Sequence, residues 1–360
     1  MTQDTALLFW WLGILTKRRY DVLKQVFGNL DEVIPVLSMD ILRELKLRQK
    51  TAEETMARIQ LLNIDRYKAE MQKHRVGLIS IEDRLYPSAL REIADPPVFL
   101  SYRGDLSILD QPLLGIVGTR EISSYGRRVV ETFVPSLVRA NLITVSGLAL
   151  GVDAAVAQQT IKAGGKTVAV LGGGLSSIYP HTNRKLAEDI VRHGGLLLSE
   201  FPLEMKPDKY TFPSRNRIIA GVSLGTLVCE APVESGSIIT ADLALDYNRS
   251  VFAVPGSIFD EQYSGCHEII SQGHARLVVR PDDVLRELGM IPSVREESMS
   301  FTPANADESM LFTVLSGMPQ TIDDLVEKTG LPASYVSVTL TMLELKDVVQ
   351  NIGGGQWVRR

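Results

Sequence analysis

The segment Leu113-Leu-Gly-Ile-Val-Gly-Thr-Arg120 joins a short apolar run to a turn of small residues. Similar apolar runs return along the chain, separated by helix-length segments; they lie at 77–81, 142–145, 167–171, 196–199, 226–229, 251–254 and 277–279. Short strands that alternate with helices are typical of βαβ units. We therefore expect an α/β fold with a Rossmann-like, doubly wound and mainly parallel sheet.

The turns that follow several of these strands are rich in small residues, and Arg120 stands in one of them. The candidates for phosphate-binding loops are Gly118, Ser146, Gly147, Gly172, Gly173 and Gly174. Because glycine has no side chain, backbone N–H groups can approach a phosphate closely there. Ligands of open α/β sheets bind beyond the carboxyl ends of the strands. We therefore expect an anionic ligand at this edge of the sheet.

A second informative segment is Phe212-Pro-Ser-Arg-Asn-Arg-Ile-Ile-Ala-Gly221, which changes from polar to apolar as the start of a buried helix would. Arg215 and Arg217 flank Asn216, and a helix N-terminus with arginine donors favours an anion. The ring of Phe212 offers a surface on which a base could stack. The alternative is that the two arginines pair with Asp and Glu residues at a surface between domains.

Two further positions are candidate functional residues. Ser235-Gly236-Ser237 precedes an apolar helical run, so its hydroxyls and N–H groups form another candidate anion site. Glu230 ends a strand and is a candidate acid or base, but pairing with an arginine of the 215–217 cluster is an equally good interpretation. The sequence leaves both roles of Glu230 open.

The composition is that of an ordinary soluble globular protein, with 45% apolar and 22% charged residues in a chain of 360. This length predicts two or three domains. No apolar run is long enough to span a membrane, and Cys229 and Cys266 provide no disulfide framework, so we expect a cytoplasmic protein. With a net charge of −5, a nucleic-acid binder would need a local basic patch.

The composition and the spacing of apolar residues change along the chain and predict four parts. Residues 1–75 are expected to form a small helical domain of the SAM or helix-hairpin-helix kind, and 76–290 hold the sheet. Residues 291–306 form a polar linker, and three helical patterns with a hairpin in 307–360 predict a winged helix. The apolar positions of the first part recur at helical spacing in 20–27, 41–45 and 57–71.

The expected winged helix is poor in positive charge. Its third helix, 333–345, contains no Lys or Arg, and from 307 to 360 four basic residues stand against seven acidic ones. Phosphate contacts dominate DNA affinity, so this part has little with which to hold DNA. We expect a protein-interaction or dimerisation role instead.

Motifs for other ligands are incomplete. Gly165-Lys166-Thr167 resembles the end of a P-loop, but Thr160 stands where the earlier glycine belongs, and a strand follows where the motif requires a helix. The G-x-G-x-x-G fingerprint of dinucleotide binding does not occur. Cys266, His267 and His274 are not accompanied by further ligands, so we expect neither a metal nor a cofactor.

The central part carries a long series of motifs in one order. They are Tyr86-Pro87, Val117-Gly118-Thr119-Arg120, Ser146-Gly147-Leu148-Ala149, Gly172-Gly173-Gly174-Leu175, Tyr179-Pro180, Ser199-Glu200, the segment 212–221, Ser235-Gly236-Ser237, Val254-Pro255-Gly256 and Gly265-Cys266. Together they resemble the DprA/Smf family, the DNA-processing proteins of bacterial natural transformation (competence). The resemblance covers about 86–279. The layout with a helical N-terminal part and a winged helix is similar to that of family members.

The resemblance implies a non-catalytic protein that binds and protects incoming single-stranded DNA, forms a homodimer and loads the recombinase RecA. It also implies a basic DNA pocket at the strand ends. By motif, this pocket maps onto Arg120, Phe212, Arg215, Asn216 and Arg217, with Lys209 and the Ser235-Gly236-Ser237 turn as further candidates. The residues themselves indicate the same chemistry, with phosphates on arginines and a base on Phe212. No motif marks the dimer face or the RecA surface.

The sequence departs from the family pattern at four positions. Leu150 stands where many members have Arg, Ala157 where the family usually has His, His267 where it has Asn, and His274 where it has a small residue. These departures bear on the strength of DNA binding and not on the fold.

Two other functional classes compete with this interpretation. Gly225-Thr226 with Glu230 resembles part of the Gly-Gly-x-Gly-Thr-x-x-Glu motif of nucleotide phosphoribohydrolases, although Val222 and Ser223 precede Leu224 and two glycines of the motif are missing. A nucleotide-binding or nucleotide-hydrolysing enzyme is therefore the first alternative. The second is an interaction scaffold that binds no DNA.

Overall fold

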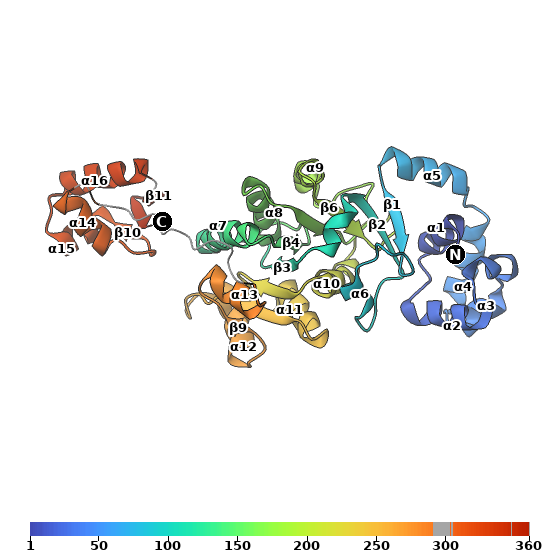
Figure 1. The fold of residues 1–360 in the computed structure, drawn as a ribbon. Coiled ribbons are helices and arrows are strands. Elements are labelled where there is room, and N and C mark those ends of the chain that lie inside the picture. The colour runs from blue at the N-terminus through green and yellow to red at the C-terminus, as the bar shows by residue number, and fades with distance from the viewer. Residues whose placement is uncertain (291–302, 304, 347, 360) are drawn as a thin grey trace. The chain divides into compact units, whose positions relative to one another are not determined.

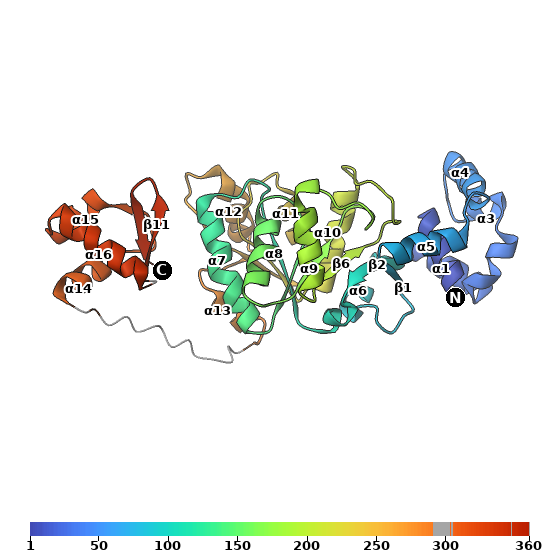
Figure 2. The ribbon, with the colours of Figure 1, turned by 90° about the horizontal axis from the view of Figure 1, so that it is seen from above.

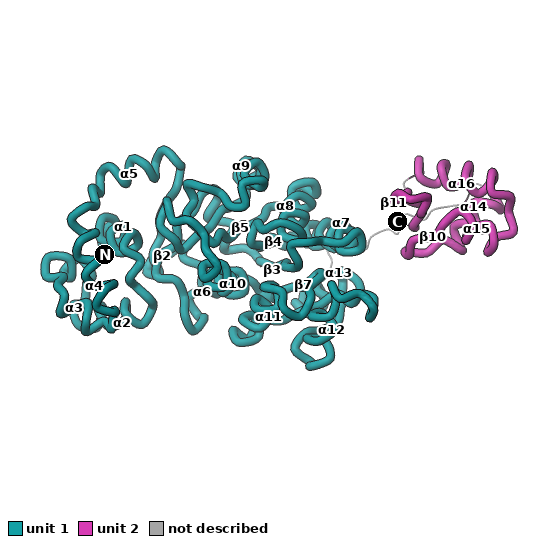
Figure 3. Tube along the Cα trace, turned by 180° about the vertical axis from the view of Figure 1, so that it is seen from behind, with its two compact units in different colours: residues 1–293 teal, residues 294–360 magenta. Residues whose placement is uncertain are grey.

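The structure is a computed structural model that describes residues 1–290, 303, 305–346 and 348–359. The chain forms two compact units, 1–293 and 294–360 (Figure 3). Most of the predicted linker, 291–306, lies outside the described residues. The predicted boundary near residue 75 falls inside the first unit, so a separate N-terminal domain stays a prediction.

In the described part of the first unit, nine strands form one sheet in the order β1-β2-β6-β5-β4-β3-β7-β8-β9. The strands are β1 Gly77–Ser80, β2 Phe99–Gly104, β3 Leu113–Val117, β4 Ile143–Ser146, β5 Thr167–Val170, β6 Leu196–Ser199, β7 Gly225–Val228, β8 Ser250–Ala253 and β9 Arg276–Leu277. β1 pairs antiparallel with β2, and β2 with β6, whereas the pairs from β6 to β9 are parallel. The prediction of a mainly parallel, doubly wound sheet is confirmed.

Helices cover both faces of this sheet, with α7, α8 and α9 on one side and α10 and α11 on the other (Figures 1 and 2). The helices of this part are α6 Ser88–Arg91, α7 Ser124–Arg139, α8 Val152–Lys162, α9 Arg184–Arg192, α10 Thr211–Val222, α11 Gly236–Asp246, α12 Ser264–Ser271 and α13 Pro281–Glu287. Every residue of β3 to β7 is buried. Burial on both faces explains why these strands are continuous apolar runs.

Five α-helices precede the sheet: α1 Gln3–Leu12, α2 Lys17–Phe27, α3 Met39–Glu44, α4 Gln49–Ile59 and α5 Ile64–Lys73. The continuous helical pattern expected at 57–71 was wrong, because α4 ends at Ile59 and Asn63 caps α5 with its side chain. The N-terminal helices also bond to the segment after β6. The indole N–H of Trp10 donates to the carbonyl of Glu200 (2.9 Å), and the hydroxyl of Tyr67 accepts from the N–H of Leu203 (3.0 Å).

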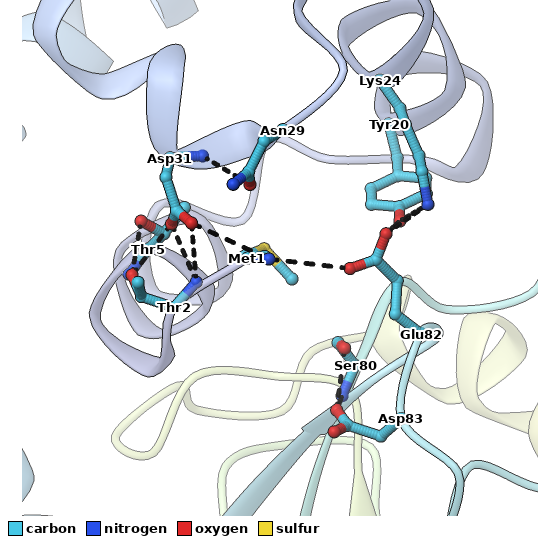
Figure 4. A network of polar contacts seen from close by, with 10 residues as sticks. All are labelled: Met1, Thr2, Thr5, Tyr20, Lys24, Asn29, Asp31, Ser80, Glu82 and Asp83. Carbon is cyan, nitrogen blue, oxygen red and sulfur yellow. Dashed lines mark hydrogen bonds and ion pairs between the residues drawn. The ribbon is translucent and has the colours of Figure 1, made fainter.

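Polar contacts fasten the N-terminal helices at a second place, after β1 (Figure 4). The carboxylate of Glu82 accepts from the hydroxyl of Tyr20 (2.6 Å) and from the ammonium group of Lys24. These two donors hold the pKa of Glu82 below its usual range. Within the helical part, the Asp31 carboxylate accepts from the backbone N–H (2.8 Å) and hydroxyl (2.9 Å) of Thr2, and hydrogen bonding lowers its pKa too.

We predict that acid loosens the contact at Glu82. Because the folded-state pKa of Glu82 is lowered, its carboxylate stabilises the fold above the ordinary value of about 4.3, and this contribution is lost as the pH falls through the lowered value. The side chain is 34% exposed, so the loss in free energy of unfolding should stay below about 1 kcal/mol.

Urea unfolding at pH 7 and pH 3.5 checks this prediction. At pH 7, Glu82→Gln should lower the urea midpoint slightly, and its midpoint should change less between the two pH values than that of the wild type. Glu44→Gln, at an exposed position of α3, serves as the control and should behave as wild type. An equal pH response in Glu82→Gln and wild type would contradict the assignment.

The second unit contains the predicted winged helix. Its elements are α14 Ala306–Val314, β10 Gln320–Thr321, α15 Ile322–Thr329, α16 Ala333–Leu345, β11 Val349–Gly353 and β12 Gln356–Arg359. Thr321 and Asp324 form the expected capping box of α15, and Gly330 ends this helix in the left-handed region. Leu311, Leu340 and Trp357 contribute to its own buried core.

Basic side chains of this unit are engaged within it. Lys346 pairs with Glu308 (2.6 Å), and the guanidinium of Arg359 lies 3.6 Å from the ring centroid of Phe312. The predicted protein-interaction role of this unit stays a prediction. Across the described residues of both units, no helix is long and apolar enough to cross a membrane.

Candidate functional site

A cavity of about 1070 Å³ opens at the carboxyl ends of the strands. It is lined by the turns after β3, β4 and β7. The chain runs from β3 outward through β4, β5 and β6, and then from β7 outward in the opposite direction through β8 and β9. The cavity therefore lies at the topological switch point, where open α/β sheets bind their ligands.

Arg120 and Phe212 meet in this cavity. The guanidinium of Arg120 lies 5.3 Å from the ring centroid of Phe212, a cation–π arrangement. Arg120 is exposed and makes no ion pair or hydrogen bond to the described residues. A cation at a concave site without a carboxylate partner is well placed to bind a phosphate.

The ring of Phe212 packs closely against Gly172. A Cβ added to Gly172 would lie 2.9 Å from Cδ1 of Phe212, so only glycine lets the ring pack this closely on the turn after β5. The ring centroid of Tyr179 lies 6.1 Å from that of Phe212, with the planes tilted by 44°. Phe212 is thus half-buried, with one side against the turn.

Arg215 is buried under the cavity and bonds to the ends of two strands. Its side chain is 5% exposed. It donates to the carbonyl of Gly147 (2.6 Å), directly after β4, and to that of Val170, the last residue of β5. Burial lowers the pKa of Arg215 to about 10, and the nearby Asp153 opposes this shift. The buried Asp153 carboxylate accepts from the N–H groups of Gly147 (2.9 Å) and Ala149 (3.2 Å). Arg215 lines the cavity, but its Nη1 already bonds to two strand-end carbonyls and its Nε to Asn216.

The two neighbours of Arg215 on α10 have different roles. Asn216 accepts from Arg215 (3.1 Å) and donates to the carbonyl of Gly236 (3.1 Å), which joins α10 to the start of α11. Arg217 pairs with Glu200 and lies 3.6 Å from Asp95. Arg217 lines a second cavity between the N-terminal helices and the sheet domain. For Arg217, the structure therefore has the carboxylate pairing that the sequence offered as an alternative.

The predicted phosphate loops are used mainly for internal packing. A Cβ on Gly147 would collide with the guanidinium of Arg215, and one on Gly174 with the carbonyls of Pro202 and Leu203. The N–H of Gly147 is bonded to Asp153, and that of Gly174 to the carbonyl of Met205 (2.8 Å). The other candidates are Ser146, which is buried, Gly173, which packs on the 205–207 segment, Gly172, and Gly118, which lines the cavity.

Ser235, Gly236 and Ser237 line the cavity at the start of α11. The oxygen of Ser235 caps this helix by accepting from the N–H of Ser237 (3.3 Å), and the two hydroxyls lie 2.6 Å apart. Glu234 is exposed beside them and also lines the cavity. Its negative charge opposes a phosphate at this end, so the positive end of the cavity lies elsewhere.

The exposed positive charges of the cavity come from Arg120 and from the segment between β6 and α10, which also carries the carboxylate of Asp208. Lys206 and Lys209 are exposed and line the cavity, and Lys209 lies over the ring of the neighbouring Tyr210 (5.0 Å). Sequence reasoning missed Lys206, Tyr179 and His181 as site residues. Tyr179 was noticed only within the Tyr179-Pro180 motif, whereas for the other two no local signal separates a cavity residue from an exposed loop residue.

Glu230 does not pair with the arginines of the 215–217 cluster. It is fully buried, and its carboxylate accepts from the N–H (3.1 Å) and hydroxyl (3.0 Å) of Ser123, the cap of α7. Among the described residues it forms no ion pair with an arginine, so the pairing with the 215–217 cluster was wrong. Burial raises the pKa of Glu230. Its place under the start of α7 indicates a structural carboxylate.

The four departures from the family pattern lie outside the described lining of the cavity. Leu150 is 47% exposed, and Ala157 is buried in the core. His267 lies 3.1 Å from the carbonyl oxygen of Gly256 through its Nε2 atom, and His274 is exposed. No group of three His, Cys, Asp or Glu side chains suited to a metal occurs among the described residues.

Comparison with known proteins agrees with this architecture. The family model of DNA recombination-mediator protein A matches residues 77–289, and that of the DprA winged helix domain matches 296–355. The DNA processing protein DprA of Bacillus subtilis (strain 168) is 42% identical over 226 residues, which is 62% of this chain and 75% of the relative.

Two solved structures are also similar. The X-ray structure of DNA processing protein A from Streptococcus pneumoniae superimposes with a TM-score of 0.66 at 36% identity, covering 80% of this chain and 98% of that one. DNA processing protein A from Helicobacter pylori gives a TM-score of 0.54 at 29% identity, covering 59% and 95%. The chain, with its matched sheet domain and winged helix, therefore belongs to the DprA/Smf family of DNA recombination-mediator proteins.

Proposed function

We propose that this protein binds single-stranded DNA in the strand-end cavity and acts as a recombination mediator. The observation that carries this proposal is the exposed guanidinium of Arg120, which lies over the Phe212 ring and makes no ion pair or hydrogen bond to the described residues. Arg120 and the nearby Lys206 and Lys209 offer charges to phosphates, and the rings offer surfaces to bases. The similar Helicobacter pylori protein has a described single-stranded DNA binding mode, which supports the same ligand.

The proposed activity is non-catalytic. A nucleotide-hydrolysing enzyme needs a carboxylate or another base that can reach the substrate. Glu230, the candidate for this role, is buried under the start of α7 and bonded to Ser123. The buried Asp153 is bonded to two backbone N–H groups. These contacts argue against Glu230 and Asp153 as catalytic bases.

The wider role follows from family membership. We propose that the protein protects incoming single strands during natural transformation, works as a homodimer, and passes the strand to RecA. Contacts with phosphates and ring faces read no base identity, so binding should depend little on DNA sequence. The winged helix then serves partners other than DNA, in line with its third helix, which contains no Lys or Arg.

Arg120→Glu is expected to weaken DNA binding about tenfold or more and to reduce the salt dependence of the affinity. The reversed charge removes one phosphate contact and repels the strand, and each lost contact lowers the slope of log K against log salt by about one. Fluorescence anisotropy of labelled oligothymidine over a salt series measures both quantities.

The matched control is Arg192→Glu. Arg192 is an exposed arginine at the far end of α9, paired with Asp189 on the same helix, and away from the cavity. Circular dichroism establishes that both variants are folded. Equal binding by Arg120→Glu and Arg192→Glu would move the DNA site elsewhere. Failure of the wild type to bind at low salt would refute the proposed function.

A further inference from the structure

The cavity contains a row of three rings, and the middle one is Tyr179. Its ring centroid lies 6.1 Å from Phe212 and 6.2 Å from His181. All three side chains line the cavity. Tyr179 is 49% exposed, and its hydroxyl makes no hydrogen bond to the described residues. A large aromatic side chain held at a cavity wall with this much exposed surface is suited to a flat ligand.

Tyr179 offers a freer ring surface than Phe212. The Phe212 ring packs against the turn at Gly172 and carries the Arg120 guanidinium over its face. A base on Phe212 would therefore share the ring with Arg120 or displace it. Tyr179, by contrast, is 49% exposed and lines the cavity.

The distance between neighbouring ring centroids indicates how the bases of a ligand could stack on them. Stacked nucleotides follow each other at about 3.4 Å along a strand, whereas neighbouring rings here are about twice as far apart. Bases on adjacent rings would therefore be separated from one another and each stacked on protein. The cavity of about 1070 Å³ also exceeds the size of most small-ligand sites, roughly 300–1,000 Å³.

We propose that Tyr179 is a second base-stacking platform, so that the cavity binds at least two adjacent nucleotides of an extended single strand and not a mononucleotide. This inference rests on the proposed function, because it needs a strand in this cavity. Lys206 and Lys209 lie at the same cavity and neutralise the phosphates of that strand.

The test compares Tyr179→Leu with the conservative Tyr179→Phe by oligothymidine anisotropy, with full-length protein. Loss of a stacked base should weaken binding by roughly 5- to 100-fold in Tyr179→Leu. Tyr179→Phe should bind within about twofold of wild type, because it keeps the ring. The salt slope should be unchanged in both, in contrast to Arg120→Glu, because tyrosine touches no phosphate in this proposal. Tyr335→Leu, at an exposed tyrosine of the winged helix, is the control.

A second measurement is independent of how the variants fold. Wild-type protein is irradiated with an oligonucleotide that carries 5-iodouracil, and the crosslinked peptide is identified by mass spectrometry. Crosslinks at Tyr179 and Phe212 are expected, and thymidine monophosphate should compete at least 100-fold more weakly than the oligonucleotide. Normal binding by Tyr179→Leu, or crosslinks that exclude Tyr179, would contradict the stacking role of Tyr179. The proposed function would still be tested separately by Arg120→Glu. No binding by wild type would remove both.

Discussion

Arg215→Ala should lower the free energy of unfolding by about 3 kcal/mol or more, the largest effect expected of any substitution at the site. The change leaves the carbonyls of Gly147 and Val170 without their buried donor and removes a cation whose charge favours the ionised form of the buried Asp153. An unsatisfied buried polar group costs about 1–3 kcal/mol, and breaking a buried charge arrangement costs about 3–5 kcal/mol. We therefore expect Arg215 to affect the proposed DNA binding mainly through the fold.

Hydrogen exchange followed by mass spectrometry locates this effect. Peptides that cover β4 and β5 should exchange faster in Arg215→Ala, and the urea midpoint of the first unit should fall. Arg192→Ala is the control, because the exposed guanidinium of Arg192 pairs with Asp189 on the same helix, away from Arg215. An Arg215→Ala protein as stable as wild type, with impaired DNA binding, would instead make Arg215 a direct ligand of the DNA.

Gly174→Ala should destabilise the first unit by about 2–3 kcal/mol, near the upper end for overpacking. The added methyl group would fall on the carbonyl oxygens of Pro202 and Leu203, which are backbone atoms and cannot rotate away. Moving this backbone also shifts the segment that carries Lys206 and Lys209. DNA affinity should therefore fall even at temperatures where the variant is folded.

Thermal unfolding and anisotropy measurements on the same preparation check both parts of this prediction. Gly236→Ala is the control for stability, because a Cβ there meets nothing within 4 Å and the backbone angle is ordinary. Its melting temperature should match or exceed that of wild type. A Gly174→Ala variant with unchanged melting temperature would mean that the 202–203 backbone yields at little cost.

The sheet could be predicted from the sequence because its central strands are buried on both faces. Such strands must be apolar throughout, and short apolar runs between helical segments identify them. The break between α4 and α5 was missed for the opposite reason. Leu61 and Leu62 continue the helical apolar pattern across the break, although Leu61 is 78% exposed and Asn63 starts a new helix.

The candidate site was predictable in its location but not in the roles of its residues. Arg215 and Arg217 are two positions apart on α10, and therefore about 200° apart around the helix axis. The sequence does not show which side of this helix faces the sheet. It could therefore not assign Arg215 to the sheet and Arg217 to Glu200. The role of the glycines in the turns was equally ambiguous, because the atoms that pack against these glycines belong to distant segments such as 202–207.

The bonds from Trp10 to Glu200 and from Tyr67 to Leu203 join residues 190 and 136 positions apart. During synthesis on the ribosome, at about 5–20 residues per second, the partner of Tyr67 emerges roughly 7–27 s after Tyr67 itself. Trp10 and Tyr67, both buried in the finished protein, must wait through that interval without the surface that covers them. The nascent helical segment therefore lacks these two hydrogen bonds until the middle of the chain has been translated.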